Sequence, residues 1–587
     1  MTLSPRRRLC WFFTVLVLGC TLFAAPGAAQ TLVDQTQTVS AQTSISRLTW
    51  SRKLDDSLTQ AADRVAQAPY LAGTEKVRVI ISVNRNSRPF LKAVLGGGGH
   101  RMRWELPVMS GISAEIPAGA LELVASLPGV FRVSVDAEVR SSQEPSDPTG
   151  PPPPPNAGST PPTTGYHDAW LVRTALGIDQ LATTNNASGS GIGVAVIDSG
   201  IAPLPDFGNR ITAFYDFTQG GIPTAPHDDY GHGTHVASLI GGAGRPSAPN
   251  ALGIAPGVRL IGLKVLAADG SGSTSDVIAA IEFATLNKDA LGIDIINLSL
   301  GHPPFEPAVT DPLVQAVQQA SAAGILVVAS AGNFGVNPST GLPGFAGISS
   351  PGNAPSALTT GSAHNQFTAQ RGDDWVNNFS SRGPTWYDGF AKPDLVAPGY
   401  KLVAASAPGS TLETSYPQFL VPDTVGDMTY IALSGTSMAA AVASGMAALT
   451  MEVSRHPDRP TLTPNAVKAI LQFTATTMFD QAGAVYHPLV QGAGGLNGIG
   501  ALKLAQAIDT SVREGEYWLT SWIHPYDLIA DEYAIWSGRL VWLQNIVWGD
   551  TVYKNLWGQN IVWGDNIVWG DNIVWGDNIV WGDSTEP

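Results

Sequence analysis

The chain has 587 residues, more than a single hydrophobic core normally holds, so several domains are expected. Its composition is that of a globular protein, 44% hydrophobic and 14% charged, with 63 Gly and 43 Pro. The formal net charge is −15, and no basic cluster follows the first ten residues. An acidic surface repels a phosphate backbone, so no nucleic-acid partner is expected.

Residues 1–29 have the pattern of a secretory signal peptide. Arginines at 6–8 precede an apolar run at 9–18, and small residues at 24–29 form a cleavage zone. The apolar run is shorter than the roughly 20 residues that a membrane-spanning helix needs. We therefore predict a protein that is secreted or displayed at the cell surface.

The two cysteines, Cys10 and Cys20, both lie in this predicted signal peptide. A mature chain cut after Ala29 would have no disulfide, no thiolate metal site and no cysteine nucleophile. The sequence VLGC at 17–20 resembles a bacterial lipoprotein cleavage box. A lipidated Cys20 is therefore kept as an alternative to simple cleavage.

A compact α+β pattern at 75–141 follows an N-terminal extension at 30–74. The predicted elements are strands at 77–83, 101–106, 111–116 and 130–135, with helices at 89–95 and 118–127. This β-α-β-β-α-β order is that of the ferredoxin-like unit, which by itself carries no function. A Pro-rich stretch at 142–165 then predicts an extended spacer without a core of its own.

Apolar strand-like runs alternate with helical stretches from 166 to 508. The predicted strands lie at 192–197, 259–265, 293–300 and 324–330, with helices at 236–242, 274–286 and 312–323. Runs that are continuously apolar are typical of a parallel sheet buried on both faces. The pattern predicts an α/β domain with a doubly wound, mostly parallel sheet and functional residues at the carboxyl ends of its strands.

Three segments of this domain place reactive side chains where such a fold would expose them. Asp198 ends the run GVAVID, His232 lies among glycines in GHGTHVA, and Ser437 precedes small residues in SGTSMAA. A buried Asp can hold an imidazole in one tautomer, and that imidazole can accept the proton of a Ser. The sequence therefore predicts a catalytic triad of Asp198, His232 and Ser437.

These segments, in the order Asp, His, Ser, resemble the three signatures of the subtilase family, the subtilisin-like serine proteases. AGN at 331–333 resembles the oxyanion motif of that family, and FSSRGP at 379–384 with KPDLVAPG at 392–399 resembles its run ahead of the Ser segment. The resemblance covers about 190–450 closely. It departs at Ala441, where many members have Pro, so helix packing there is open.

The resemblance implies a serine endopeptidase in which Ser437 is the nucleophile, His232 the general base and then acid, and Asp198 the group that orients His232. It implies that Asn333 and the Ser437 N–H stabilise the oxyanion. Two backbone segments would pair with extended polypeptide substrates: Ser299, Leu300 and Gly301, and opposite them Gly270, Ser271 and Gly272. It also implies that 75–141 is an inhibitory propeptide, which assists folding and blocks the cleft until it is cleaved.

Other polar residues near these motifs have simpler explanations. His235 is expected to be structural, and Asp228 and Asp229 are expected in a solvated loop, with metal ligation as the alternative. Turn or surface positions are expected for Asp206, Asp216 and Asp269. The chemistry requires no cofactor. Calcium is common in the family, but no loop here matches a calcium signature, so metal sites are left open.

After a connector at 509–544, the hexapeptide NIVWGD opens the tail at 545–550 and recurs four times within 560–583. A small meander of hairpins with exposed Trp side chains is one interpretation, and disorder in the isolated chain is the other. The tail resembles repeats at the ends of some bacterial subtilases and is expected to bind a surface, a partner or itself. Two rival classes stay open: an adhesion protein that works through this tail, and a catalytically inactive scaffold.

Overall fold

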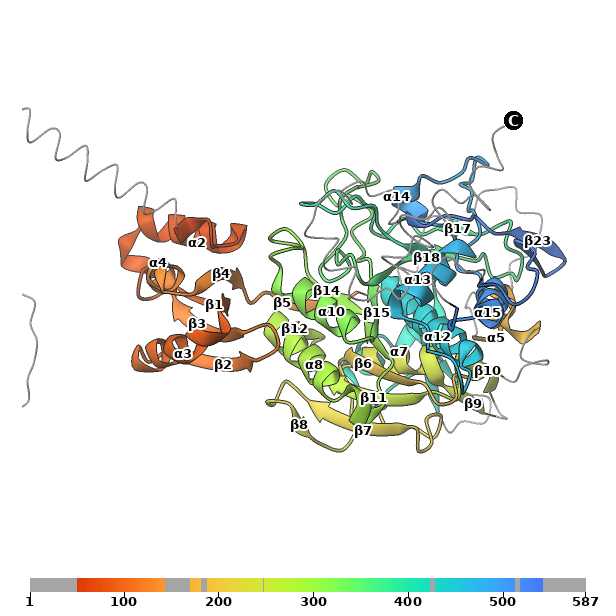
Figure 1. Cartoon of the computed structure of the whole chain (residues 1–587), viewed down its shortest axis with the longest axis horizontal. Coiled ribbons are helices and arrows are strands. Elements are labelled where there is room, and N and C mark those ends of the chain that lie inside the picture. The colour runs from red at the N-terminus through yellow and green to blue at the C-terminus, as the bar shows by residue number, and fades with distance from the viewer. Residues whose placement is uncertain are drawn as a thin grey trace, which may run out of the picture. The chain divides into compact units, whose positions relative to one another are not determined.

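The computed structural model describes residues 50–142, 169–180, 187–245, 248–422, 428–512 and 518–541 (Figure 1). The chain divides into Met1–Arg52 and Lys53–Pro587. Only residues 50–52 of the first part are described, so the fold is that of the second. The predicted signal peptide, most of the Pro-rich spacer and the repeat tail lie outside the described residues.

The N-terminal region of the second part is built on a four-stranded antiparallel sheet with the order β2-β3-β1-β4. Its strands are β1 (Lys76–Val83), β2 (Arg101–Leu106), β3 (Gly111–Pro117) and β4 (Val130–Val135). The connections contain α3 (Arg88–Gly97), α4 (Leu121–Ser126) and the 3₁₀ turns η2 (Arg85–Ser87) and η3 (Ala118–Ala120), and a further 3₁₀ turn, η1 (Pro69–Leu71), precedes β1. The last five residues of β1 are buried, because this strand lies between β3 and β4 in the middle of the sheet.

A helix that the sequence patterns did not indicate precedes this sheet. α2 (Asp56–Gln67) begins after Asp55, whose carboxylate accepts a 2.7 Å hydrogen bond from the Leu58 N–H. This is the N-cap that an aspartate supplies most effectively. Leu58 and Ala61 are buried, so the end of the predicted extension at 30–74 is part of the folded structure.

A nine-stranded, mostly parallel sheet organises the larger part of the chain. Its order is β17-β16-β15-β13-β6-β11-β7-β8, with β18 paired to β16, and only β8 and β17 are antiparallel to their neighbours. The strands are β6 (Gly193–Asp198), β7 (Ile211–Asp216), β8 (Ile222–Pro223), β11 (Arg259–Lys264), β13 (Ile295–Leu298), β15 (Leu326–Ser330), β16 (Leu358–His364), β17 (Trp375–Val376) and β18 (Leu395–Pro398). The predicted doubly wound, mostly parallel sheet is confirmed.

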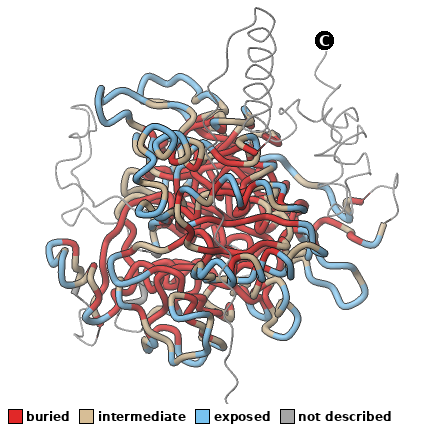
Figure 2. Tube along the Cα trace, turned by 90° about the vertical axis from the view of Figure 1, so that its left-hand side faces the viewer, coloured by how far each residue is buried: buried red, intermediate tan, exposed pale blue. Residues whose placement is uncertain are grey.

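Helices cover both faces of this sheet, and neighbouring residues of one strand therefore enter two different cores. In β6, Val194 and Val196 pack into the core formed with α7 (His232–Gly241) and α12 (Thr436–Ser454). Ala195 and Ile197 pack into the other core, with α8 (Thr274–Leu286) and α10 (Pro312–Ala322). A strand buried on both faces needs no polar alternation, which explains the continuous apolar runs of the sequence. Figure 2 shows the buried residues gathered in the interior and exposed residues mainly in loops.

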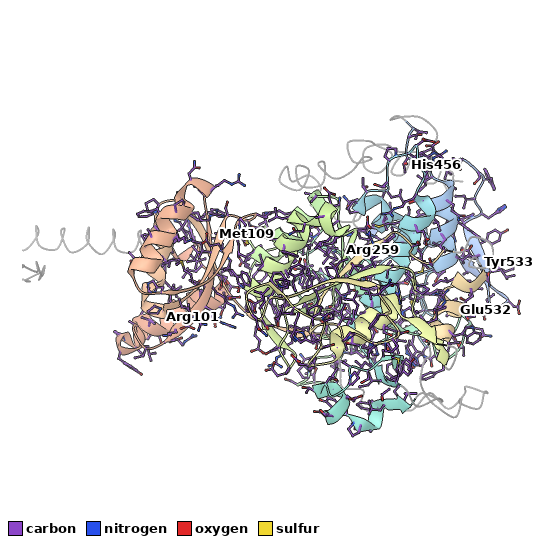
Figure 3. All side chains as sticks on the ribbon, turned by 90° about the horizontal axis from the view of Figure 1, so that it is seen from below. Arg101, Met109, Arg259, His456, Glu532 and Tyr533 are labelled. Carbon is purple, nitrogen blue, oxygen red and sulfur yellow. The ribbon has the colours of Figure 1, made fainter. Side chains whose placement is uncertain are left out.

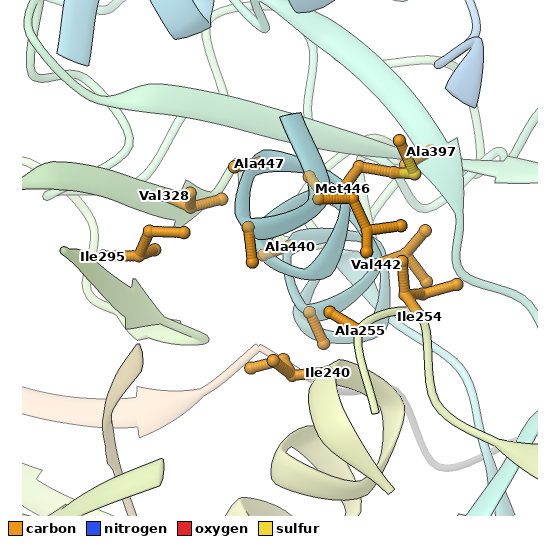
Figure 4. Packing of buried hydrophobic residues seen from close by; sticks show 14 of the residues in the cluster. Ile240, Ile254, Ala255, Ile295, Val328, Ala397, Ala440, Val442, Met446 and Ala447 are labelled. Atoms are coloured by element: carbon orange, nitrogen blue, oxygen red, sulfur yellow. The ribbon is translucent and has the colours of Figure 1, made fainter. Parts of the chain in front are cut away.

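The central helix α12 carries Ser437 near its start and is buried from Thr436 to Met451. Figure 4 shows Ala440, Val442, Met446 and Ala447 of this helix among Ile240, Ile254, Ala255, Ile295, Val328 and Ala397. Gly445 permits this close packing, since a Cβ atom there would lie 2.5 Å from Ile254 Cβ. The helix continues through the buried Ala441, so the departure from Pro leaves it unbroken. By length and composition α12 could cross a membrane, but 89% of its apolar window is buried within the protein.

Residues beyond the predicted boundary at 508 still belong to this core. Strands β22 (Tyr526–Ile529) and β23 (Glu532–Ile535) form a hairpin. The adjoining Trp536 is buried against Phe473, and its indole N–H donates to Asp527 over 2.6 Å. Glu532, labelled in Figure 3, accepts the backbone N–H groups of Arg371 and Gly372, both at 3.0 Å. The predicted connector at 509–544 therefore contains a packed hairpin.

Shorter elements complete the described part of the chain. The helices are α5 (Ala169–Ala175), α9 (Lys288–Leu291), α11 (Thr411–Ser415), α13 (Pro464–Phe473), α14 (Pro488–Gln491), α15 (Gly498–Ala507) and the 3₁₀ turn η4 (Pro417–Phe419). The strands are β5 (Glu138–Ser141), β9 (Ala243–Arg245), β10 (Ala248–Leu252), β12 (Ser271–Ser273), β14 (Leu300–Gly301), β19 (Leu402–Ala405), β20 (Leu420–Pro422) and β21 (Thr429–Leu433). Three of these strands, in the order β12-β5-β14, form a separate small sheet, which contains predicted substrate-binding residues.

Candidate active site

Asp198 and His232 form a buried pair at the carboxyl edge of the large sheet. Asp198 is the last residue of β6, and His232 is the first residue of α7. His232 Nδ1 lies 2.8 Å from Asp198 Oδ1 and 3.0 Å from Oδ2. Helix and strand approach this closely because of Gly233, where a Cβ atom would lie 2.2 Å from the Gly200 carbonyl oxygen. A carboxylate at Nδ1 requires the ring to carry its hydrogen there, which leaves Nε2 as a proton acceptor.

Ser437 lies at the start of α12, beside the end of the strand next to β6. Its Oγ donates to the carbonyl oxygens of Ser299 over 2.9 Å and of Ser142 over 2.7 Å. The backbone N–H of Ser437 also donates to the Ser142 carbonyl, over 3.2 Å. His232 Nε2 is buried and has no hydrogen-bond partner among the described residues. In this arrangement the hydroxyl is turned to the two carbonyl groups and the acceptor nitrogen of His232 is available.

The side-chain amide of Asn333 is held through its oxygen. Oδ1 accepts from Thr436 N over 3.1 Å and from Thr436 Oγ1 over 3.0 Å. Nδ2 is buried without a hydrogen-bond partner in the described part of the chain. Thr436 directly precedes Ser437, so the contact brings a free N–H donor of Asn333 to the start of α12. A buried unpaired donor is costly, and a negatively charged oxygen would satisfy it.

Asp228, expected in a solvated loop or as a metal ligand, has a different role. It is buried, and its carboxylate accepts five hydrogen bonds. The donors are Ser199 Oγ, Tyr230 N, Gly231 N, Thr234 N and Thr234 Oγ1, at 2.7 to 3.2 Å. Since these donors flank Asp198 and His232 in the sequence, Asp228 ties the two residues' local backbones together. The two adjacent aspartates before GHG were the sequence feature that could have identified this role, but the sequence does not distinguish the buried Asp228 from the half-exposed Asp229.

Four of the six predicted substrate-binding residues pair with β5 in the small sheet. Leu300 and Gly301 of β14 lie opposite Ser141 and Arg140, and Ser271 and Gly272 of β12 lie opposite Arg140 and Val139. A fifth, Ser299, accepts the Ser142 N–H through its carbonyl over 3.1 Å. Gly270 makes no pair with β5 and instead forms the turn before β12, with φ +76° and its N–H on the Ala267 carbonyl. Ser273, opposite Glu138, is an additional member.

His235, the second histidine of the His232 segment, is structural as predicted. It is fully buried, and its Nε2 lies 3.0 Å from the Leu402 carbonyl and 3.1 Å from that of Ile431. Burial lowers the pKa of this imidazole to about 3, so it stays neutral and joins α7 to β19 and β21.

Asp206 and Asp216 are buried, and Asp269 is the exposed one of the three remaining aspartates. Asp216 accepts from Thr218 N and Oγ1, and Asp269 accepts from Ser271 N and Oγ, as turn residues do. Asp206 lies in a turn, the first of the two expected positions, but it is buried there and accepts from Ser238 Oγ over 3.2 Å. Burial raises the pKa of Asp206.

The KPD sequence ahead of the Ser segment forms a buried polar network. Lys392 Nζ lies 2.7 Å from Asp394 Oδ2, and Lys468 Nζ lies 3.0 Å from Asp394 Oδ1. Burial lowers the pKa of Lys468 to about 7, and Asp394 opposes that shift. Asp394 also accepts the N–H of Thr359, which holds β18 beside β16. The motif therefore has a structural role in positioning the sheet under α12.

Within the described ranges, no group of three or more His, Cys, Asp or Glu side chains is arranged to hold a metal ion. Backbone carbonyl and amide oxygens can also bind calcium, so this finding leaves calcium open.

Comparison with known proteins places this geometry in a family. The model of the subtilase family matches residues 189–494. The serine protease AprX of Bacillus subtilis is 38% identical over 315 residues, which are 53% of this chain and 66% of AprX. Subtilisin DY of Bacillus licheniformis is 32% identical over 292 residues, 50% of this chain and 86% of that protein.

A solved structure has the same fold. Fervidolysin from Fervidobacterium pennivorans, described as a keratinolytic enzyme related to subtilisin, aligns with a TM-score of 0.53 and 21% identity. The alignment covers 73% of this chain and 61% of fervidolysin. The fold and the Asp198–His232 pair are those of a subtilisin-type serine endopeptidase domain. The chain belongs to the subtilase family.

Proposed function

We propose that this chain is a secreted serine endopeptidase that cuts extended polypeptides and is made as a self-inhibited precursor. Ser437 is its nucleophile, His232 its base and acid, Asp198 the group that orients His232, and Asn333 the side-chain oxyanion donor. The observation that carries the proposal is that Ser437 Oγ and Ser437 N both donate to one backbone carbonyl oxygen, that of Ser142.

The residues support acyl transfer in two halves. Ser437 Oγ attacks the substrate carbonyl carbon while His232 Nε2 takes its proton, and Asp198 holds the resulting imidazolium at Nδ1. The oxygen that becomes negative accepts from Ser437 N–H and from Asn333 Nδ2, which is free for it. His232 then protonates the leaving nitrogen, and a water molecule, deprotonated by the same imidazole, hydrolyses the ester.

The small sheet supports substrate binding through the main chain. A peptide between β12 and β14 has backbone hydrogen-bond partners on both sides, so its binding does not depend on most of its side chains. This favours a broad range of polypeptide substrates.

The region 75–141 is proposed to be the ferredoxin-like inhibitory propeptide. Its sheet order and its last strand, β5, which occupies the place between β12 and β14, support this role. Further contacts anchor it to the catalytic domain. Asp136 accepts hydrogen bonds from Ser275 N and Oγ, both at 2.8 Å. The backbone N–H of Met109, a residue labelled in Figure 3, donates to Glu282 over 2.8 Å. A strand that fills the substrate position excludes other substrates.

Secretion is proposed from the signal-peptide pattern of 1–29. Recovery of the protein in the culture medium, with a chain lacking residues 1–29 as control, tests it. A Cys20→Ala variant distinguishes the lipidated alternative, because only a lipidated protein would be lost from the membrane fraction by that change.

Labelling with a serine-directed fluorophosphonate tests the enzyme assignment. Processed protein should be labelled at Ser437, and Ser437→Ala should not be labelled. Ser454→Ala, a matched change at the far end of the same helix, should be labelled as the unmodified protein is. Absence of labelling on processed, folded protein would instead favour the inactive scaffold.

A further inference from the structure

The end of β5 lies in the site as a substrate would. Ser142, which follows β5, directs its carbonyl oxygen to Ser437 N over 3.2 Å and to Ser437 Oγ over 2.7 Å. Its own N–H donates to the Ser299 carbonyl, and its hydroxyl accepts from Ser330 Oγ over 3.0 Å. Every polar group of this residue therefore has a partner in the catalytic domain, and its carbonyl oxygen accepts from both the hydroxyl and the backbone N–H of Ser437.

The register of this strand has a physical cause. Val139 is fully buried in the same apolar core as Leu266 and Leu300, whereas Glu138 and Arg140 on either side of it are exposed. Side chains alternate between the two faces of a strand, so a slip of one residue would bury Glu138 or Arg140 in that apolar place. Burying an unpaired charge is far more costly than burying a valine.

Contacts just before β5 oppose a slip of two residues. The Ala137 carbonyl accepts from Thr274 N over 2.9 Å, and the Asp136 carboxylate accepts twice from Ser275. Both partners lie at the N-terminus of α8. A shift of β5 in either direction would break these bonds and the bond from Ser142 N to the Ser299 carbonyl, so contacts at both ends of β5 determine the position of the Ser142 carbonyl.

We infer that the bond from Ser142 to Gln143 is the one that the enzyme cuts in its own precursor. This inference rests on the proposed function, which it makes specific. Ser437 Oγ bonds to the Ser142 carbonyl carbon, and the Ser437 proton passes through His232 to the Gln143 nitrogen as the carbon–nitrogen bond breaks. Water then cleaves the ester, which restores Ser437 and leaves a Ser142 carboxylate and a Gln143 amino terminus.

The cut defines both products. The released fragment ends in Glu138–Ser142, and its new carboxylate keeps the Ser437 N–H as a donor, so the product remains a competitor for the site. The mature chain begins at Gln143, the second residue of the predicted spacer at 142–165. Cleavage one residue beyond the predicted boundary at 141 thus leaves nearly all of the spacer on the mature enzyme.

The test uses the full-length precursor made in a cell-free system with inhibitors of other protease classes. A time course followed by intact mass and N-terminal sequencing should give a first fragment that ends at Ser142 and a partner that begins at Gln143. Ser142→Pro removes the N–H that binds the Ser299 carbonyl and should abolish cleavage at this bond. Ser146→Pro, the same change four residues further on in the spacer, should be cut as the unmodified chain is.

The outcomes separate this inference from the proposed function. A first cut at another bond that still requires Ser437 would overturn the Ser142 assignment and leave self-processing intact. Cleavage of Ser437→Ala at the normal rate would overturn self-processing itself. The ends of the unmodified fragments decide the assignment even if Ser142→Pro fails to fold.

Discussion

The side-chain amide of Asn333 is held by hydrogen bonds at its oxygen, and its nitrogen is available as a donor. Thr436 occupies Oδ1 with two donors, and the buried Nδ2 has no hydrogen-bond partner among the described residues. Because Asn333 is bound to Thr436, the residue before Ser437, the proposed mechanism makes this donor preorganised for charge that develops on a substrate carbonyl. An interaction that strengthens only in the transition state should affect turnover rather than binding.

Asn333→Ala should therefore lower kcat by about 100- to 1,000-fold with little change in KM. Steady-state kinetics on a short peptide checks this. The control is Asn337→Ala, an exposed asparagine in the following loop, which should change neither constant. A large rise in KM with kcat intact would contradict the oxyanion role.

Asp228 accepts hydrogen bonds from residues that flank Asp198 and His232, so we expect it to act on the site as a positioning residue. All five of its hydrogen-bond partners are donors, so an amide in its place would turn its own N–H groups toward at least one of them. Hydrogen bonds to a buried charged group contribute about 1.5–3 kcal/mol each to the free energy of unfolding.

Asp228→Asn should lower the free energy of unfolding by about 1–3 kcal/mol and reduce kcat more than it changes KM, because His232 loses its support. Denaturant unfolding and kinetics measure the two effects. Asp289→Asn, the same change at an exposed aspartate of α9, should leave both unchanged. If Asp228→Asn loses stability but keeps its kcat, the residue supports the fold and does not position His232.

At the scale of elements, α8 joins the N-terminal region to the catalytic domain through buried acidic groups. Glu282 accepts from Met109 N, and Asp276 accepts from Trp104 Nε1 over 2.6 Å. Burial raises the pKa of Glu282 to about 7, against the hydrogen bonds from Met109 and Val108, which lower it. A raised carboxyl pKa means that the folded precursor holds a proton that the unfolded chain releases.

The stabilisation from Glu282 is thus complete below pH 4.5 and is lost as pH rises through about 7. A shift of this size corresponds to about 3 kcal/mol. The uncut Ser437→Ala precursor should lose Tm between pH 5 and 8. A further Glu282→Gln change, which keeps the acceptor oxygen but cannot ionise, should reduce that loss but not remove it, because burial also raises the pKa of Glu306 to about 8 and that of Asp374 to about 7. Calorimetry across this range, with the exposed Glu122→Gln as control, tests the assignment. An unchanged slope in Glu282→Gln would refute it.

At the scale of the whole molecule, the core extends past the family signatures. Trp518, Trp536 and Leu540 are buried in the core that also contains α12. Val541 N donates to the buried Gln472 over 2.8 Å. Residues up to 541 therefore stabilise the catalytic domain, whereas the repeats at 545–587 supply no group that the proposed mechanism uses.

A chain ending at residue 544 should hydrolyse a short peptide at the rate of the full-length enzyme, and a chain ending at 508 should be unstable because it loses buried tryptophans. Removing the tail should instead change how the protein distributes between cells and medium, since the tail carries repeated Trp side chains. Peptide assays and fractionation of the two truncated chains test both points. If the chain ending at 544 fractionates as the full-length protein does, the tail does not bind a surface or partner. If that chain loses peptide hydrolysis, the tail is part of the folded core.

The sequence by itself determined the class of the large domain and pointed to its candidate reactive residues, because both depend on local patterns. Continuous apolar runs predict buried parallel strands, and Asp198 marks the end of one of them. The predicted helix at 274–286 agrees with α8, since Ser273 caps its first turn and the cap is a local hydrogen bond. The order of short motifs then indicated the family, which the comparisons confirm.

Only the tertiary structure decided how residues distant in the sequence meet. Asp228 and Asp229 are neighbours of the same type, and packing against Ser199 buries one and leaves the other half exposed. Residues 509–541 carry too weak a periodicity to reveal that Trp536 fills a gap beside Phe473. The Ser142 carbonyl reaches Ser437, 295 positions away, because β5 is held between two strands of another domain. Such contacts follow from the shape of the assembled core, which no local pattern contains.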